Sequence, residues 1–143
     1  MSQENRAILD RINEEAFRQG NTGVIDELVA EEFVEHNPMP GFEGNREGFK
    51  QMVAGLHQAF PDFDTQVQDQ IADGDKVVER WTAGGTQEGD FMGVPATGRR
   101  IEIEGMDISR IEDGKVVEHW TQMDAMAMMQ QLGVIPEEQE AQA

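Results

Sequence analysis

The first part of the chain carries hydrophobic side chains at helical spacing. Over residues 3–19, apolar positions recur three or four residues apart, which predicts an amphipathic helix that ends at Gly20. A shorter helix is expected after Thr22, which can cap it, and a third helix begins at Asn45 and ends before Pro61. Between these two helices, residues 33–36 are predicted to form a short extended piece.

Beyond Pro61 the hydrophobic positions alternate with polar ones, which is typical of strands. Glycine-containing turns at 73–75 and 112–114 separate these strands into hairpins. The strands are expected over residues 63–71, 76–86, 101–111 and 115–123, with a loop rich in glycine and proline at 89–98. Met126, Met128, Met129 and Leu132 then predict a last short helix that ends at Gly133.

Helices followed by an antiparallel meander indicate an α+β fold, with the helices gathered on one face of a curved sheet. Such a sheet leaves a conical pocket, which is the usual site for a small apolar ligand. We expect one domain over residues 1–135 and a flexible acidic tail at 136–143, because the last residues are EEQEAQA.

The net charge of the chain limits the kinds of molecule that it is expected to bind. It has 143 residues, with 29 acidic against 11 basic side chains and a net charge of −18. This charge would repel nucleic acid and an anionic membrane surface, so neither is an expected partner. An evenly acidic surface with few lysines favours a protein adapted to high salt, although an ordinary acidic bacterial enzyme is the alternative.

Two residue types are missing, and each absence excludes a class of chemistry. Without cysteine, thiol catalysis, cysteine-type zinc sites and disulfides are excluded, and without tyrosine no phenol can act as an acid. The three histidines lack the spacing of zinc ligands, so no metal site is expected. The hydrophobic runs are too short to span a membrane and the N-terminus is too polar for a signal peptide, so a cytoplasmic protein is expected.

Three ordered segments resemble a known family. Residues 85–98, GTQEGDFMGVPATG, are similar to the GTHxGxFxGxPATG segment of the SnoaL-like polyketide cyclases, also called ester cyclases. The run from Arg110 to Trp120, followed by Asp124 and QLG at 131–133, resembles their R-x-x-D-G-K-I-x-E-x-W-x-x-x-D…QLG pattern, and residues 33–38 resemble F-x-x-H-x-P. The similarity covers about residues 5–135. It implies an NTF2-like cone and aldol ring closure on a polyketide methyl ester, with neither a metal nor an organic cofactor.

The resemblance places Asp124 at the family's acid/base position. A single carboxyl group can remove a proton next to a carbonyl and later return it, if an apolar pocket raises its pKa. Glu118, Trp120 and Gln122 share one face of an extended segment with Asp124. Of these, Trp120, Gln122 and Asp124 are expected to look into the pocket. The alternative is that Asp124 caps the last helix, and the two roles are compatible.

Two positions depart from the family pattern. Gln87 stands where the family has the histidine of GTH, which keeps a hydrogen-bonding group but removes a titratable one. Ser109 stands where cyclases often carry a second histidine, and Asp107 precedes it by two residues. Because Asp107 and Ser109 share a strand face, an inward carboxylate at 107 is possible, and a solvent-facing one is the alternative.

Further pocket candidates are aromatic or imidazole side chains. His36 either lines the pocket or is a hydrogen-bonded structural histidine, and Trp81 and Trp120 are core residues that can also serve as a ligand platform. Phe91 in the glycine-rich loop is a candidate lid. Since His119 alternates with Trp120 along the strand, it is expected to point away from the pocket.

Three functions remain open. The first is cofactor-independent acid/base catalysis, of lyase or isomerase type, on a small apolar carbonyl compound. A variant is epoxide hydrolysis, for which Asp107, Arg80 and Asp124 could form the required relay. The other class is a non-catalytic module that binds a hydrophobic molecule or dimerises. Apolar side chains at Val77, Trp81, Ile101 and Ile103 also lead us to expect a homodimer packed sheet to sheet.

Overall fold

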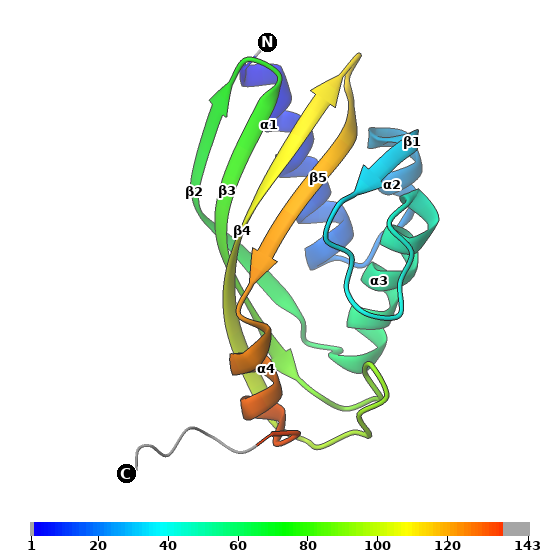
Figure 1. Ribbon diagram of the computed structural model, residues 1–143, viewed down its shortest axis with the longest axis vertical. Helices are drawn as coiled ribbons and strands as arrows, with labels where there is room; N and C mark the ends of the chain where they lie inside the picture. The colour runs from blue at the N-terminus through cyan, green and yellow to red at the C-terminus, as the bar shows by residue number, and fades with distance from the viewer. Residues whose placement is uncertain (1, 136–143) are drawn as a thin grey trace.

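A computed structural model describes residues 2–135. The chain-order elements are α1 (Ser2–Arg11), the π-helix η1 (Ile12–Arg18), α2 (Gly23–Leu28), β1 (Val29–Glu35), α3 (Arg46–Ala59), β2 (Asp64–Asp73), β3 (Lys76–Thr86), β4 (Arg100–Glu112), β5 (Lys115–Met123) and α4 (Ala125–Leu132). The α+β class is confirmed (Figure 1). The predicted acidic tail at 136–143 lies outside the described residues.

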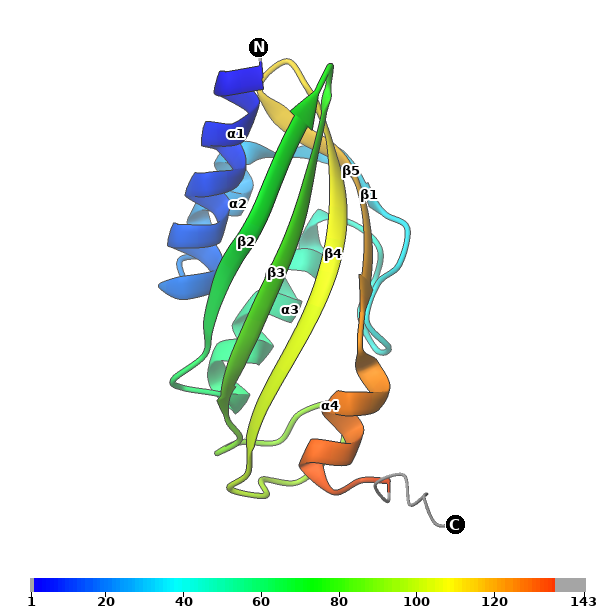
Figure 2. The same cartoon turned by 90° about the vertical axis from the view of Figure 1, so that its left-hand side faces the viewer.

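The five strands form one curved sheet in the order β1-β5-β4-β3-β2. Strands β2 to β5 pair antiparallel. Tight turns join β2 to β3 and β4 to β5, as the glycine positions predicted, whereas a longer loop joins β3 to β4. Strand β1 is the exception, because it pairs parallel to β5 at the edge of the sheet. Figure 2 shows α1, α2 and α3 on one side of the sheet and α4 beyond the end of β5.

Most of the helix ends are fixed by local hydrogen bonds and backbone conformation. The Asn45 side chain accepts a hydrogen bond from the Gly48 amide at 2.8 Å, and Gly133 ends α4 in the left-handed conformation, with φ 83°. Thr22 makes no capping bond, because the Asn21 side chain accepts from the Gly23 amide instead. The first helix also departs from expectation, since it widens into the π-helix η1 before Gly20.

An extra residue in β5 decides which of its side chains face the helices. Arg110 pairs with Glu118 and Ile111 pairs with Val116, so Val117 is a β-bulge. The bulge changes which side chains of β5 face inward. Val116 is buried in the core, but beyond the bulge the inward-facing side chains are those at odd-numbered positions.

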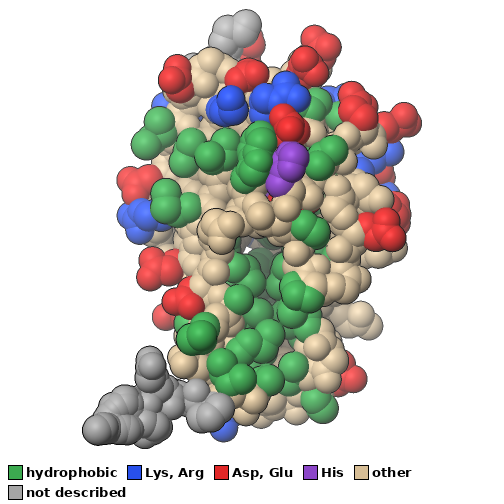
Figure 3. All heavy atoms as spheres, in the orientation of Figure 1, with side chains coloured by type: hydrophobic (Ala, Val, Ile, Leu, Met, Phe, Trp, Pro, Cys, Tyr) green, Lys and Arg blue, Asp and Glu red, His purple; other side chains and the backbone are tan. Residues whose placement is uncertain are grey.

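The outer face of the sheet carries its own band of hydrophobic side chains. Cross-strand pairs join Ile71 to Val78, Val78 to Ile108 and Ile108 to Trp120. Figure 3 shows hydrophobic side chains crossing the upper part of this face. The expectation that Val77, Trp81, Ile101 and Ile103 extend onto the outer face is wrong, because all four face the core or the cavity.

Within residues 2–135, no helix is both long enough and apolar enough to cross a membrane.

Candidate active site

A cavity of about 130 Å³ lies between the inner face of the sheet and α3. Figure 3 shows its hollow below the middle of the molecule, surrounded mainly by hydrophobic side chains. Its walls are largely aromatic and aliphatic, including Phe17, Phe49, Met52, Trp81, Ile103 and Met123. Such a surface suits an apolar organic molecule.

Trp81 reaches the cavity wall because its strand neighbour is a glycine. Trp81 on β3 pairs with Gly105 on β4. A Cβ added at Gly105 would overlap the indole ring and would also lie 2.7 Å from the backbone oxygen of Gln122. Any side chain at 105 would therefore displace the indole.

A row of polar side chains crosses the inner face at one end of the cavity. Glu79 on β3 pairs with Asp107 on β4, and Glu35 on β1 pairs with His119 on β5. His119 is diagonal to Asp107, because its own partner on β4 is Ser109. Glu35, Asp107 and His119 of this row line the largely apolar cavity, whereas Glu79 is buried next to Asp107 and does not line it.

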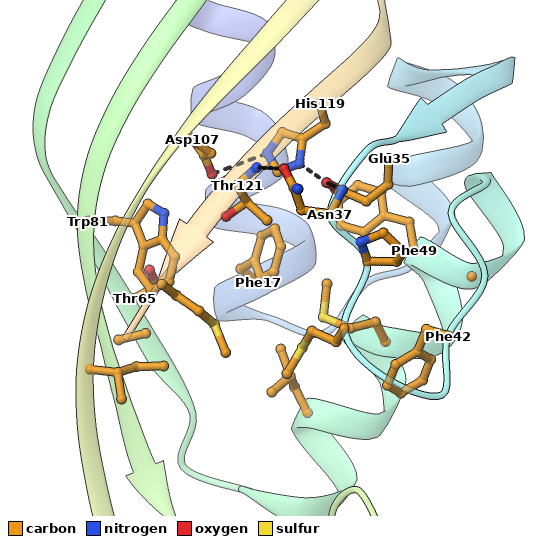
Figure 4. Close-up of a pocket in the computed structure, with 18 of the residues that line it drawn as sticks. Phe17, Glu35, Asn37, Phe42, Phe49, Thr65, Trp81, Asp107, His119 and Thr121 are labelled. Atoms are coloured by element: carbon orange, nitrogen blue, oxygen red, sulfur yellow. Dashed lines mark hydrogen bonds and ion pairs between the residues drawn. The ribbon is translucent and has the colours of Figure 1, made fainter. Parts of the chain in front are cut away.

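His119 links two of these carboxylates. Its Nδ1 lies 2.5 Å from Oε1 of Glu35, and its Nε2 lies 3.2 Å from Oδ2 of Asp107 (Figure 4). Burial alone would lower the pKa of His119, but the hydrogen bonds and charges of Asp107 and Glu35 outweigh it and raise the pKa to about 10. At neutral pH the ring is an imidazolium that donates from both nitrogens.

Asp107 has one oxygen engaged and one free. While Oδ2 accepts from His119, Oδ1 is buried and has no hydrogen-bond partner among the described residues. Asp107 is also part of the cavity wall. An unpartnered carboxylate oxygen is costly to bury, so its presence beside a cavity points to a partner that arrives with a ligand.

Glu79 is the deepest carboxyl group of the row, with 2% of its surface exposed. Both oxygens accept from the Asn13 amide at 3.1 Å, and Oε2 also accepts from Gln70 at 2.8 Å. Burial raises the pKa of Glu79. The hydrogen bonds from the side-chain amides of Asn13 and Gln70 oppose that rise, and the charge of the nearby Asp107 adds to it. Asn13 comes from η1 and also lines the cavity.

Asn37 and Thr121 add amide and hydroxyl groups beside His119. The Asn37 side-chain oxygen accepts from the Thr121 amide at 3.1 Å, which fixes the loop after β1 against β5. Both residues line the cavity, and Figure 4 shows them next to the pair of His119 and Asp107.

The structure places Asp124 outside this cavity. It is the N-cap of α4, its Oδ1 accepts from the Ala127 amide at 3.0 Å, and its side chain is exposed. This placement corrects the expectation that Asp124 faces the pocket. The physical reason is that β5 ends at Met123, whose side chain points inward, so the next residue turns away to begin the helix.

The side chains expected to share a pocket face with Asp124 lie on the outer face of the sheet. His36 stacks on Trp120 with ring centroids 4.8 Å apart, and its Nε2 lies 3.0 Å from Oε2 of Glu118. Arg110 donates to the other oxygen of Glu118 at 2.5 Å, and these bonds from Arg110 and then His36 lower the pKa of Glu118. Gln122 is exposed on the same face. The cavity is therefore lined by none of these four residues, His36, Glu118, Trp120 and Gln122.

Gln87, Phe91 and Ser109 are buried but do not line the cavity. Gln87 organises the glycine-rich loop: it donates to the carbonyls of Gly89 and Val94 and accepts from the amide and hydroxyl of Thr97. Phe91 packs edge-on against Phe60 in the core, with centroids 5.4 Å apart, instead of covering the pocket as a lid.

The relay considered for epoxide hydrolysis is not assembled. Arg80 is exposed on the outer face and pairs with Asp69, with 2.7 Å between Nη2 and Oδ2. Asp107 faces the cavity and Asp124 faces solvent, so the three side chains do not meet.

Sequence reasoning placed Trp81 and Asp107 among the pocket candidates, and the structure locates both in the cavity wall. It missed Glu35 and pointed His119 away from the pocket, although both line the cavity. One signal was available for Glu35: it shares strand parity with the buried Phe33. No such signal existed for His119, because the Val117 bulge resets the parity of β5.

Comparisons with known proteins identify the family. A family model described as SnoaL-like polyketide cyclase matches residues 7–132. Aklanonic acid methyl ester cyclase DauD from Streptomyces sp. (strain C5) is 31% identical over 126 residues, covering 83% of this chain and 76% of that protein. The structure is similar to TsrD from Streptomyces laurentii, with a TM-score of 0.85 and 29% identity over 94% of this chain and 98% of that one.

A second solved structure, IdmH from Streptomyces antibioticus, is 36% identical with a TM-score of 0.75, covering 90% of this chain and 98% of that one. The shared architecture confirms the NTF2-like α+β cone that the sequence resemblance implied. The chain therefore belongs to the SnoaL-like polyketide cyclase family.

Proposed function

We propose that this protein closes a ring in a small apolar carbonyl ester by an intramolecular aldol reaction, with Asp107 as the acid/base. The observation that supports this proposal is the free Oδ1 of Asp107, buried at the wall of an apolar cavity while Oδ2 is held by His119. Asp107 takes the role that the sequence resemblance suggested for Asp124.

The proposed reaction conserves every atom of the substrate. Oδ1 of Asp107 removes a proton from the carbon next to a carbonyl, and the resulting enolate carbon attacks a second carbonyl of the same molecule. A carbon–carbon bond forms, and the alkoxide takes the proton back from the Asp107 carboxyl group. One group thus serves first as base and then as acid.

The neighbouring side chains have supporting roles in this scheme. His119 and Glu35 hold Asp107 in one orientation, because the imidazolium donates to both carboxylates. Asn37 and Thr121 offer an amide and a hydroxyl group that can donate to a carbonyl oxygen as charge develops on it. The aromatic walls exclude water and position the carbon skeleton.

The names of the curated relatives guide the choice of test substrates. Two are aklanonic acid methyl ester cyclases and one is a nogalonic acid methyl ester cyclase. These two methyl esters are therefore the first substrates to test, with ring closure followed by chromatography and mass spectrometry.

The decisive variant is Asp107→Asn, which keeps the shape of the side chain but cannot exchange the proton. We expect kcat/KM to fall by about 10²–10⁴-fold, the usual contribution of a general acid/base. Asp124→Asn is the matched control, because it makes the same change at an exposed cap, and its activity should stay within about twofold of wild type.

Full activity in Asp107→Asn would overturn the assignment of the acid/base. If the esters bind in the cavity and no ring closure occurs, the non-catalytic binding module becomes the better account.

A further inference from the structure

We propose that the polar end of the cavity selects its ligand by charge, binding an apolar molecule with an ammonium head group in preference to the matching carboxylate, and that the buried Glu79 sets this preference. The inference rests on the same cavity as the proposed function, but it concerns binding and needs no turnover.

The polar row carries a surplus of carboxyl groups. His119 is the one cation, and it is already shared between Glu35 and Asp107. Within residues 2–135, the hydrogen bonds that Glu79 receives come from the neutral amides of Asn13 and Gln70. Among the described residues that line the cavity there is no lysine and no arginine. A ligand that reaches this end therefore meets more negative than positive charge.

The charged groups around Glu79 do not cancel this surplus. Asp10 on α1 accepts from the same Gln70 amide at 3.0 Å, and Asp107 is the cross-strand neighbour. Arg6 on α1 donates to the backbone oxygen of Gln70 at 3.1 Å. The charged side chains that act on Glu79 are thus the two acids, and the arginine is bonded to the Gln70 carbonyl.

The free Oδ1 of Asp107 supplies the acceptor for an ammonium group. An ammonium head can donate a hydrogen bond to this oxygen, whereas a carboxylate head has no proton to donate and would be repelled. The aromatic rings of Phe17, Phe49 and Trp81 line the same cavity, and Figure 4 shows them on the cavity side of the linked Glu35, His119 and Asp107. Such rings accommodate both an aromatic body and an adjacent cation.

Burial explains why Glu79 acts at a distance. A charge enclosed by protein is screened far less than one in contact with water, so Glu79, 2% exposed, influences the whole polar end. Glu43 is a useful contrast, because it lines the cavity, which Glu79 does not, but its side chain is exposed to water. Removing the charge of Glu43 should therefore matter much less.

The test uses three ligands that share one body: naphthylethylammonium, methyl naphthylpropanoate and naphthylpropanoate. Their binding is measured by isothermal titration calorimetry at about pH 8 in about 0.5 M KCl, which suppresses attraction to the acidic surface. We expect the ammonium to bind at least about tenfold more tightly than the propanoate, with the ester between them and with one ammonium per chain. The ester should displace the ammonium if both occupy the cavity.

Glu79→Gln should reduce the ratio of ammonium to propanoate affinity by at least about threefold, whereas Glu43→Gln should leave it within about twofold. An unchanged ratio in Glu79→Gln would overturn the role of Glu79, and propanoate binding as tightly as ammonium would overturn charge selection. Because burial raises the pKa of Glu79, protonation at lower pH should also reduce the preference for ammonium over ester in the wild type. This pH series does not depend on the variant folding, and a preference independent of pH would contradict the inference.

The outcome is separate from that of the cyclisation assay. If no ester is cyclised, the order of ligand affinities still tests charge selection. If cyclisation occurs and the three ligands bind equally, only the charge selection fails.

Discussion

His119 carries a charge that its two neighbours impose. An exposed histidine is mostly neutral at pH 7, but here the carboxylates of Glu35 and Asp107 hold both ring protons. The imidazolium is therefore a fixed donor that orients Asp107. As a positioning residue it acts on the substrate only through that carboxylate.

The charge of His119 makes stability depend on pH. The pKa is about 10 in the folded protein against an ordinary value of 6.5, so the folded state binds this proton more tightly. Its contribution to the free energy of unfolding is complete below about pH 6.5 and is lost as the pH rises through about 10. Urea unfolding between these limits should show this decline.

The comparison needs a variant in which the titration is removed. His119→Gln should flatten the decline, and His36→Gln, at an exposed histidine, should leave it in place. The absence of tyrosine and the presence of only three lysines leave few other groups titrating in this range. A decline that persists in His119→Gln would show that another group causes it.

At the scale of elements, the junction of β5 and α4 separates the two aspartates. The bulge at Val117 turns His119, Thr121 and Met123 toward the cavity, and the strand ends there. Asp124 then begins the helix with its side chain on the Ala127 amide. The last residues of the strand therefore line the cavity, whereas the next residue caps the helix.

Asp124→Ala should lower the free energy of unfolding by about 1 kcal/mol, because the helix loses its cap, and Asp124→Asn should change it by much less. Thermal or chemical unfolding of both variants measures this difference. Asn45→Ala removes the corresponding cap of α3 and gives a second reference. Equal stability of Asp124→Ala and wild type would contradict the capping role.

At the scale of the whole molecule, negative charge dominates the surface. The 29 acidic side chains exceed the 11 basic ones, and many ion pairs are exposed, such as Arg11 with Glu27 and Arg80 with Asp69. Exposed pairs of this kind contribute little to stability and are weakened by salt. Repulsion among the unpaired acids is therefore the larger effect of the charge distribution.

Salt should stabilise this protein. Because screening removes the repulsion between acids, we expect the unfolding midpoint to rise steeply between dilute buffer and molar KCl. Equal midpoints in dilute and concentrated salt would contradict an adaptation to high salt. Thermal unfolding over a KCl series measures the effect.

The outer band of Ile71, Val78, Ile108 and Trp120 leads us to expect a homodimer packed sheet to sheet. Ile71 is 61% exposed, and the band crosses four neighbouring strands. Light scattering in molar KCl should give about twice the 16.0 kDa mass of one chain. Ile71→Lys should weaken this association, and a monomeric mass for the wild type in molar salt would exclude it.

The sequence by itself determined the order of the elements and several of their ends. These signals were the helical and alternating periodicities, the Asn45 cap and the glycines at 74, 114 and 133. Each acts within a few residues, so it can be recognised in the sequence before the fold is known. The parallel pairing of β1 with β5 was not predicted, because it joins segments far apart in the chain.

The candidate site was decided by tertiary structure. Glu35 and His119 are 84 residues apart, and only the pairing of β1 with β5 brings them into contact. The face of β5 depended on a bulge whose two valines, Val116 and Val117, are equally apolar and so give no sign of which faces the core. The charge of His119 depended on burial beside two carboxylates. Local pattern specifies local geometry, whereas the protonation of a buried group is determined by all the chain segments that surround it.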